Sequence, residues 1–159
     1  MSTHTLRSHV SSVPTPLVEP AGVAVVLGGS EGIGAAIVRR LAAAGHQVVA
    51  VARTAEVLAA TCLDIDPTGR TVVALAADLT ARDAADLVCR RATEAFGATP
   101  SIIVQSASMF RAGPLSAVDD DELSEMFQAN VAAPFRTIRR LVAGITTERG
   151  HVVIINSSA

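Results

Sequence analysis

The stretch that decides the fold is the glycine-rich segment 27–34, LGGSEGIG, which directly follows the apolar run VAVV at 23–26. Such a segment can leave a buried strand and open a helix, so that backbone N–H groups and the positive end of the helix dipole face one point. Helical character continues to residue 44, and a second β-branched run, QVVAVA, occupies 47–52. This context predicts a strand–turn–helix unit that binds a phosphate-bearing ligand; a tight turn without a ligand is the alternative.

Short β-branched runs alternate with alanine-rich helical stretches along the rest of the chain, as expected of β-α-β units on a parallel sheet. Gly45 and Gly97 follow two of the helical stretches, and glycine commonly ends a helix. Pro134 lies inside the last helical stretch, where we expect a bend or break near 130–134. The predicted strands are 23–28, 47–52, 71–77, 101–107 and 151–156, and the predicted helices are 32–44, 54–62, 80–96 and 118–143.

Length and composition indicate one α/β domain with a core of small and β-branched side chains. Half of the 159 residues are apolar, but only four are aromatic, and all four are phenylalanine. Residues 1–20 are rich in Ser, Thr and Pro, and burial cannot repay the entropy of ordering them. We therefore predict a disordered extension over 1–20 and a folded domain over 21–159.

Charge and cysteine content exclude several classes of protein. The net charge of −2, with both signs interspersed, gives no basic stripe for nucleic acid. No apolar run reaches the ~18–20 residues of a membrane span, and the N-terminus lacks a secretion signal, so we expect a soluble cytoplasmic protein. Cys62 and Cys89 lack a CxxC pattern or a histidine at ligand spacing, which predicts reduced thiols and no metal site.

The glycine segment resembles the TGxxxGIG loop of the short-chain dehydrogenase/reductase family, rather than the G-x-G-x-x-G of most dinucleotide-binding folds. Leu27 stands where that family usually has threonine. The resemblance covers nearly all of 23–159 and implies a Rossmann-type doubly wound parallel sheet of about five strands in the order 3-2-1-4-5. It also implies hydride transfer between NAD(P)(H) and a small-molecule alcohol or carbonyl substrate, by an enzyme that forms a homo-oligomer. The loop residues that would bind the cofactor are Gly28, Gly29, Ser30, Glu31, Gly32, Ile33 and Gly34.

Two residues of opposite charge bear on the choice between NADP and NAD. Arg53 ends the second predicted strand, where the family recognises a ribose 2′-hydroxyl or 2′-phosphate, and a guanidinium pairs with phosphate through charge-assisted bonds. Glu31 argues the other way, because NADP-using relatives often carry a base at that loop position. We expect NADP, with NAD as the less favoured alternative. The resemblance places Asp78, followed by Leu79, at the adenine amino group; the alternative is an acid at a helix N-terminus.

The segment after the fourth predicted strand matches the family only in part. QSAS at 105–108 stands where the family commonly has NNAG, on the nicotinamide side of the cleft. Ser106 and Ala107 are the residues expected there. Ala107, Ser108 and Phe110 also give a weaker likeness to the pteridine-reductase branch.

Three further residues match the family's catalytic positions. Asn130, in FQANVAAPF, corresponds to the asparagine that interrupts a helix and helps hold a water of the proton relay; an exposed helical asparagine is the alternative. The last predicted strand leads to Ser157 and Ser158, one of which would hydrogen-bond the substrate oxygen. Counting from Gly150 favours Ser157, and alignment of the serine pair favours Ser158.

The sequence contains no tyrosine and no lysine. The family protonates the substrate oxygen with a tyrosine whose pKa is depressed by a lysine four residues later. We therefore expect the N-terminal part of a longer oxidoreductase, truncated before that motif and lacking turnover by itself. A non-catalytic sensor or interaction module that binds NADP(H) is the alternative function.

Overall fold

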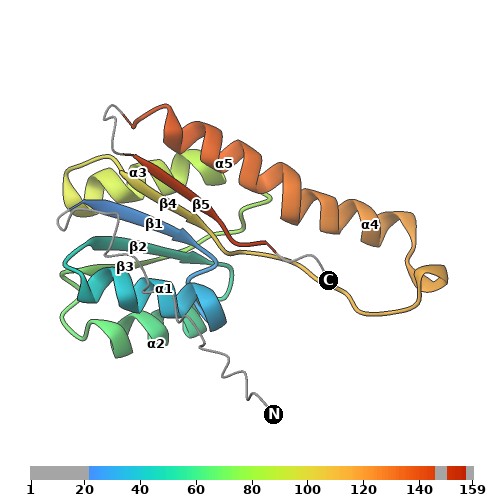
Figure 1. Cartoon of the computed structure of the whole chain (residues 1–159), viewed down its shortest axis with the longest axis horizontal. Helices are drawn as coiled ribbons and strands as arrows, with labels where there is room; N and C mark the ends of the chain where they lie inside the picture. The colour runs from blue at the N-terminus through green and yellow to red at the C-terminus, as the bar shows by residue number, and fades with distance from the viewer. Residues whose placement is uncertain (1–21, 146–149, 157–159) are drawn as a thin grey trace, which may run out of the picture.

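The computed structural model describes residues 22–145 and 150–156 and arranges them as a parallel sheet between two helical layers (Figure 1). The five strands lie in the order β3-β2-β1-β4-β5, and every neighbouring pair is parallel. The predicted fold class and strand order are therefore confirmed. The predicted extension, 1–20, lies outside the described residues. The strands are β1 (Val23–Leu27), β2 (Gln47–Ala52), β3 (Val72–Ala76), β4 (Ile102–Gln105) and β5 (His151–Ile154).

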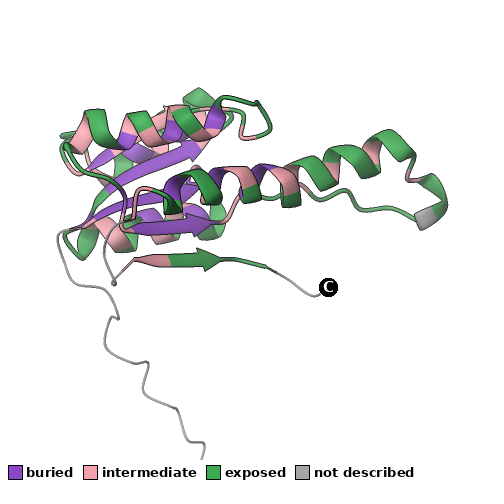
Figure 2. Cartoon of the chain, turned by 90° about the horizontal axis from the view of Figure 1, so that it is seen from above, coloured by how far each residue is buried: buried purple, intermediate pink, exposed green. Residues whose placement is uncertain are grey.

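The side chains at the centre of the sheet are buried and mostly apolar, as is usual for parallel strands that are covered on both faces. Every residue of β1 is buried, and β1 pairs with β2 from Val23 opposite Gln47 to Leu27 opposite Val51. At the edge of the sheet, β5 exposes Val152, Val153 and Ile154, as its green colour in Figure 2 shows. β5 therefore forms an apolar edge of the sheet in the described part of the chain.

Successive side chains of each strand point to opposite faces of the sheet, and helices pack against them on both faces. Helices α1 (Gly32–Ala43) and α2 (Ala55–Ile65) pack on the face that carries Ala24 and Val26. Helices α3 (Ala84–Phe96) and α5 (Ala133–Val142) pack on the face that carries Val25 and Leu27. None of the helices in the described part of the chain is long and apolar enough to cross a membrane.

The last helical segment differs from the expected bend or break. Helix α4 (Asp120–Phe127), the π-helical turn η2 (Gln128–Ala132) and α5 follow one another with right-handed helical backbone angles at their junctions. Pro134 lies in the first turn of α5, directly after the π turn. The irregularity is thus a π turn, and α4 extends past the end of the sheet (Figure 1). A short 3₁₀ turn, η1 (Leu115–Ala117), precedes α4.

Candidate functional site

A cleft of about 320 Å³ lies at the carboxyl ends of the strands. In the sheet order, β1 is flanked by β2 and β4, so the chain reverses its winding direction there. Ligands of doubly wound sheets bind at such switch points. The lining residues come from the segments after four strands and from η2: Gly28, Ser30, Glu31, Ala52, Arg53, Thr54, Ala77, Asp78, Leu79, Thr80, Ser106, Ala107, Ser108, Met109 and Ala129.

Two glycines of the loop are required by contacts within the protein. Gly28 has a φ of 86°, and a Cβ built on it would lie 2.5 Å from the Ala107 nitrogen. A Cβ on Gly34 would collide with the Gly28 carbonyl oxygen. By contrast, a Cβ on Gly32 would meet no atom within 4 Å, although its φ is 54°. Gly32 is therefore the loop glycine that faces open space.

The N-terminus of α1 has donors that fit an anion. Glu31 is its N-cap residue but makes no side-chain capping bond, and the first turn holds no acidic residue. The Ala35 amide donates to the Glu31 carbonyl at 3.1 Å, which leaves the Gly32, Ile33 and Gly34 amides without a partner in the helix. These donors, together with the helix dipole, suit the pyrophosphate of a dinucleotide.

Arg53 and Asp78 also line the cleft, just after the ends of β2 and β3. Arg53 is exposed. Asp78 Oδ1 accepts hydrogen bonds from the Thr80 amide at 2.9 Å and from the Thr80 hydroxyl at 2.8 Å. These bonds, and to a smaller extent the charge of Arg53, hold the pKa of the Asp78 carboxyl below its usual value. Asp78 is therefore a carboxylate acceptor at neutral pH.

The interpretation of Asp78 as a helix N-terminal acid is wrong. Helix α3 begins at Ala84 rather than at Thr80 as predicted. The Asp78 carboxylate instead accepts hydrogen bonds from Thr80 in a turn that precedes the helix.

The β4 end of the cleft is held by a buried amide. Gln105 Nε2 donates to the Ala107 carbonyl at 2.7 Å, and the Ser106 amide donates to the Leu27 carbonyl at 2.8 Å. Among the described residues, Gln105 Oε1 is buried without a hydrogen-bond partner. Ser106 and Ala107 thus lie next to the glycine loop.

The predicted catalytic residues are placed only in part. Asn130 lies on η2 and does not line the cleft, but its neighbour Ala129 does. The Asn130 side chain is bonded to the backbone of Met109, another lining residue. Ser157 and Ser158 lie outside the described residues. No group of three or more potential metal ligands occurs in the described ranges.

Sequence reasoning located most of the cleft but not all of it. Of the predicted loop residues, Gly29, Ile33 and Gly34 do not line it, and neither does Gly32. The lining residues that were missed lie within a few positions of a strand's carboxyl end or beside Asn130, which is a signal that the sequence offers. They are Ala52, Thr54, Ala77, Thr80, Ser108, Met109 and Ala129.

Comparison with known proteins gives a consistent set of matches. A family model described as short chain dehydrogenase matches residues 22–159. A short chain dehydrogenase of Pseudocercospora fijiensis is 32% identical over 85% of this chain and 44% of its own length. The structure of a dehydrogenase/reductase from Sinorhizobium meliloti 1021 aligns with a TM-score of 0.81 and 32% identity, over 89% of this chain and 56% of that one.

A further similar structure is that of a complex with a nucleotide. It is a blue fluorescent protein from a metagenomic library in complex with NADPH, and it aligns with a TM-score of 0.77 and 34% identity over 86% of this chain and 56% of that one. The chain thus spans about half the length of these relatives.

Proposed function

Because the chain belongs to the short-chain dehydrogenase family, we propose that it provides the dinucleotide-binding part of an oxidoreductase that transfers hydride between NADP(H) and an alcohol or carbonyl substrate. One observation carries this proposal: Ser30 and Glu31 at the start of α1, Arg53 and Asp78 all border the same cleft. The free amides of α1 would bind the pyrophosphate, and the Asp78 carboxylate would accept from the adenine amino group. Ser106 and Ala107 would lie beside the nicotinamide, which would supply or accept the hydride when bound.

We propose NADP(H) rather than NAD(H) as the cofactor because of Arg53. An exposed guanidinium at the end of β2 can make several charge-assisted bonds to a 2′-phosphate. The relative whose structure is described with NADPH supports this choice. Glu31 acts against it, since a carboxylate in the same cleft repels a phosphate.

The catalytic residues of the proposal are Asn130 and one of Ser157 and Ser158. The serine hydroxyl would bond the substrate oxygen, and Asn130 would help hold a water of the proton relay. Both polar groups of the Asn130 side chain bond the Met109 backbone.

A second candidate function is NADP(H) binding without turnover. It is motivated by the glycine loop and its cleft in a sequence that contains neither tyrosine nor lysine, the residues that the family uses for proton transfer. Calorimetry on the chain with NADPH and NADH measures the binding that both candidates require. Assays of NADPH oxidation with a panel of ketones and aldehydes, run on a version extended by the codons that follow Ala159 in the gene, separate them: turnover by the extended version supports the oxidoreductase, and binding without turnover supports the sensor. A folded chain that binds neither nucleotide contradicts both.

We also propose that the enzyme self-associates through α4, η2 and α5. Leu123, Phe127, Val131 and Phe135 recur every four residues and are exposed. Helix α4 carries only acidic charges and α5 only basic ones. Two copies packed antiparallel would therefore bring opposite charges together. Sedimentation equilibrium tests this: a dimer is expected, and a monomer at all concentrations contradicts it.

A further inference from the structure

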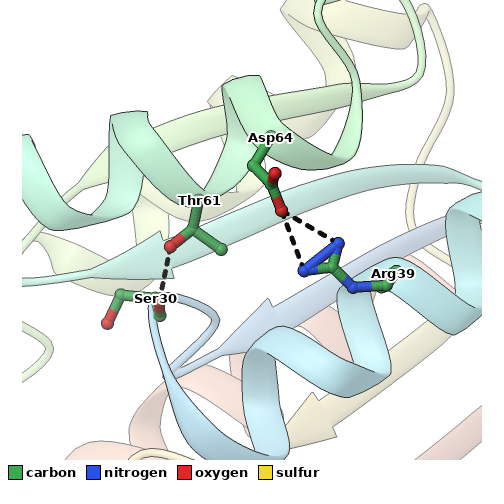
Figure 3. A network of polar contacts seen from close by, with 4 residues as sticks. All are labelled: Ser30, Arg39, Thr61 and Asp64. Atoms are coloured by element: carbon green, nitrogen blue, oxygen red, sulfur yellow. Dashed lines mark hydrogen bonds and ion pairs between the residues drawn. The ribbon is translucent and has the colours of Figure 1, made fainter.

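The hydroxyl of Thr61 ties helix α2 to the glycine loop. Thr61 Oγ1 donates to the Ser30 carbonyl at 2.7 Å across 31 positions of sequence (Figure 3). Threonines inside helices commonly bond the carbonyl four residues earlier in their own helix. Thr93 of α3 does so, with its hydroxyl donating to the Cys89 carbonyl at 3.3 Å. The Thr61 hydroxyl instead donates its hydrogen bond to a loop that borders the cleft.

This bond sets the orientation of one peptide group in the loop. In a trans peptide the C=O and the following N–H point in opposite directions. A Ser30 carbonyl that points to α2 therefore turns the Glu31 amide away from α2. The loop upstream is also fixed, because the Gly28 and Gly29 amides both donate to the Val51 carbonyl, at 2.8 and 3.0 Å. Ser30 and Glu31 themselves line the cleft.

A second contact holds the two helices beside each other. Both terminal nitrogens of Arg39, on α1, lie 3.0 to 3.1 Å from Asp64 Oδ2, on α2 (Figure 3). Asp64 follows Thr61 by three residues, so both side chains lie on the side of α2 that faces α1. An exposed ion pair of this kind adds little stability by itself, but it accompanies Thr61 at the same helix–helix contact.

We propose that Thr61 is a positioning residue for the pyrophosphate-binding loop. Its hydroxyl holds the Ser30–Glu31 peptide so that the start of α1 is ordered before the nucleotide binds. A loop that is already ordered in the free protein does not have to lose conformational entropy when the ligand binds, so binding is tighter. This inference rests on the proposed function, because it takes the loop to be the pyrophosphate site.

The test compares two ligands on matched variants by calorimetry. NADPH contains the pyrophosphate, whereas adenosine 2′-monophosphate keeps the adenine and the 2′-phosphate but lacks it. Thr61→Val keeps the shape and removes the donor, and it is expected to weaken NADPH roughly three- to tenfold. Binding of adenosine 2′-monophosphate should change by less than about twofold, since no bond to its groups is lost. Thr61→Ser keeps the hydroxyl, so its NADPH affinity should stay close to that of the wild type.

Controls separate positioning from general destabilisation. Thr93→Val removes a helical threonine hydroxyl outside the cleft and should leave both affinities unchanged, and Thr61→Ala replaces Thr61→Val if the latter fails to fold. Unchanged NADPH affinity in Thr61→Val, or equal loss of both ligands, overturns the inference alone. A wild-type chain that does not bind NADPH overturns the proposed function, and the inference with it.

Discussion

The side chain of Asn130 is bonded at both of its polar atoms to the backbone of one residue, Met109. Its Oδ1 accepts from the Met109 amide and its Nδ2 donates to the Met109 carbonyl, each at 2.7 Å. Asn130 lies on the π turn, and Met109 lies in the long loop after β4. The π turn and the loop that walls the cleft are thus fixed to each other. Asn130 is an exposed helical asparagine, as the alternative interpretation had it, and its side chain is bonded to Met109.

Asn130→Ala should therefore loosen the loop and destabilise the chain. Two hydrogen bonds at an exposed position are together worth roughly 1–2 kcal/mol. Asn130→Asp should fall between wild type and Asn130→Ala, because it can still accept from the Met109 amide but cannot donate. Urea denaturation measures the loss, and Gln128→Ala, an exposed change on the same π turn, is the control. If Asn130→Ala and Gln128→Ala have the same effect, the Met109 bonds do not stabilise the fold.

Arg53→Ala should separate the two nucleotides. The variant loses charge-assisted bonds worth roughly 1.5–3 kcal/mol to a 2′-phosphate, which corresponds to a ten- to hundredfold weaker NADPH affinity. NADH carries a hydroxyl at that position, so its affinity should change little. Calorimetry with both nucleotides measures the difference, and the exposed Arg70→Ala is the control for lost surface charge. A parallel loss of NADPH and NADH affinity would place Arg53 away from the 2′ position.

The sequence predicted the strands well because each contains a short apolar run rich in β-branched residues, a pattern typical of strands in a parallel sheet. All five observed strands lie inside the predicted ranges. Helix starts were less predictable. The delay of α3 to Ala84 depends on the carboxylate of Asp78 bonding to Thr80, and such local side-chain bonds compete with helix without altering its periodicity.

The candidate site could be located from the sequence but not constructed from it. The loop glycines and Arg53 directly follow predicted strands. Their position at the edge of the sheet where the strands' carboxyl ends lie was therefore predictable. The contacts of Gly28 with Ala107 and of Thr61 with Ser30 were not, because they depend on how β1, β4 and α2 are placed in space. The close approach of Ala107 shows that Gly28 is required for packing.

Two glycine substitutions in the loop should have different consequences. In Gly34→Ala the new Cβ collides with the Gly28 carbonyl, so we expect a loss of roughly 1–3 kcal/mol in the free energy of unfolding. In Gly32→Ala the Cβ meets open space, and the cost is the strain of a positive φ, about 1 kcal/mol. If the proposed function is right, Gly32→Ala should, however, weaken NADPH binding, because the new methyl group would lie at the N-terminus of α1, whose amides are proposed to bind the pyrophosphate.

Thermal or urea denaturation and calorimetry on the two variants separate these effects. The expected pattern is a larger stability loss in Gly34→Ala and, per unit of lost stability, a larger affinity loss in Gly32→Ala. Gly69→Ala is the matched control, since Gly69 also has a positive φ and open space around it but lies in a turn outside the cleft. If Gly32→Ala and Gly69→Ala bind NADPH equally well, Gly32 does not face the ligand.

Asp66 makes the stability of the chain dependent on pH. Its Oδ1 accepts from the Thr68 hydroxyl at 2.6 Å and the Thr68 amide at 3.0 Å, and its Oδ2 accepts from the Thr71 and Val72 amides at 2.6 and 3.0 Å. The Thr68 hydroxyl and these backbone amides hold the pKa of the Asp66 carboxyl well below its usual range. One ionised side chain thereby joins the end of α2 to the start of β3.

The sign of the pH effect follows from that lowered pKa. A carboxyl that is more acidic in the folded than in the unfolded chain contributes stability above its unfolded pKa of about 3.9, and this stability is lost as the pH falls below about 5. Asp66→Asn cannot accept at both former oxygens, so it should be less stable than wild type at pH 7. The difference should shrink as the pH falls below the unfolded pKa of about 3.9, because the unfolded wild-type chain then binds a proton that the folded chain does not. Urea denaturation across this range measures it, and a constant difference between the two proteins at every pH would show that the charge of Asp66 is not what joins α2 to β3.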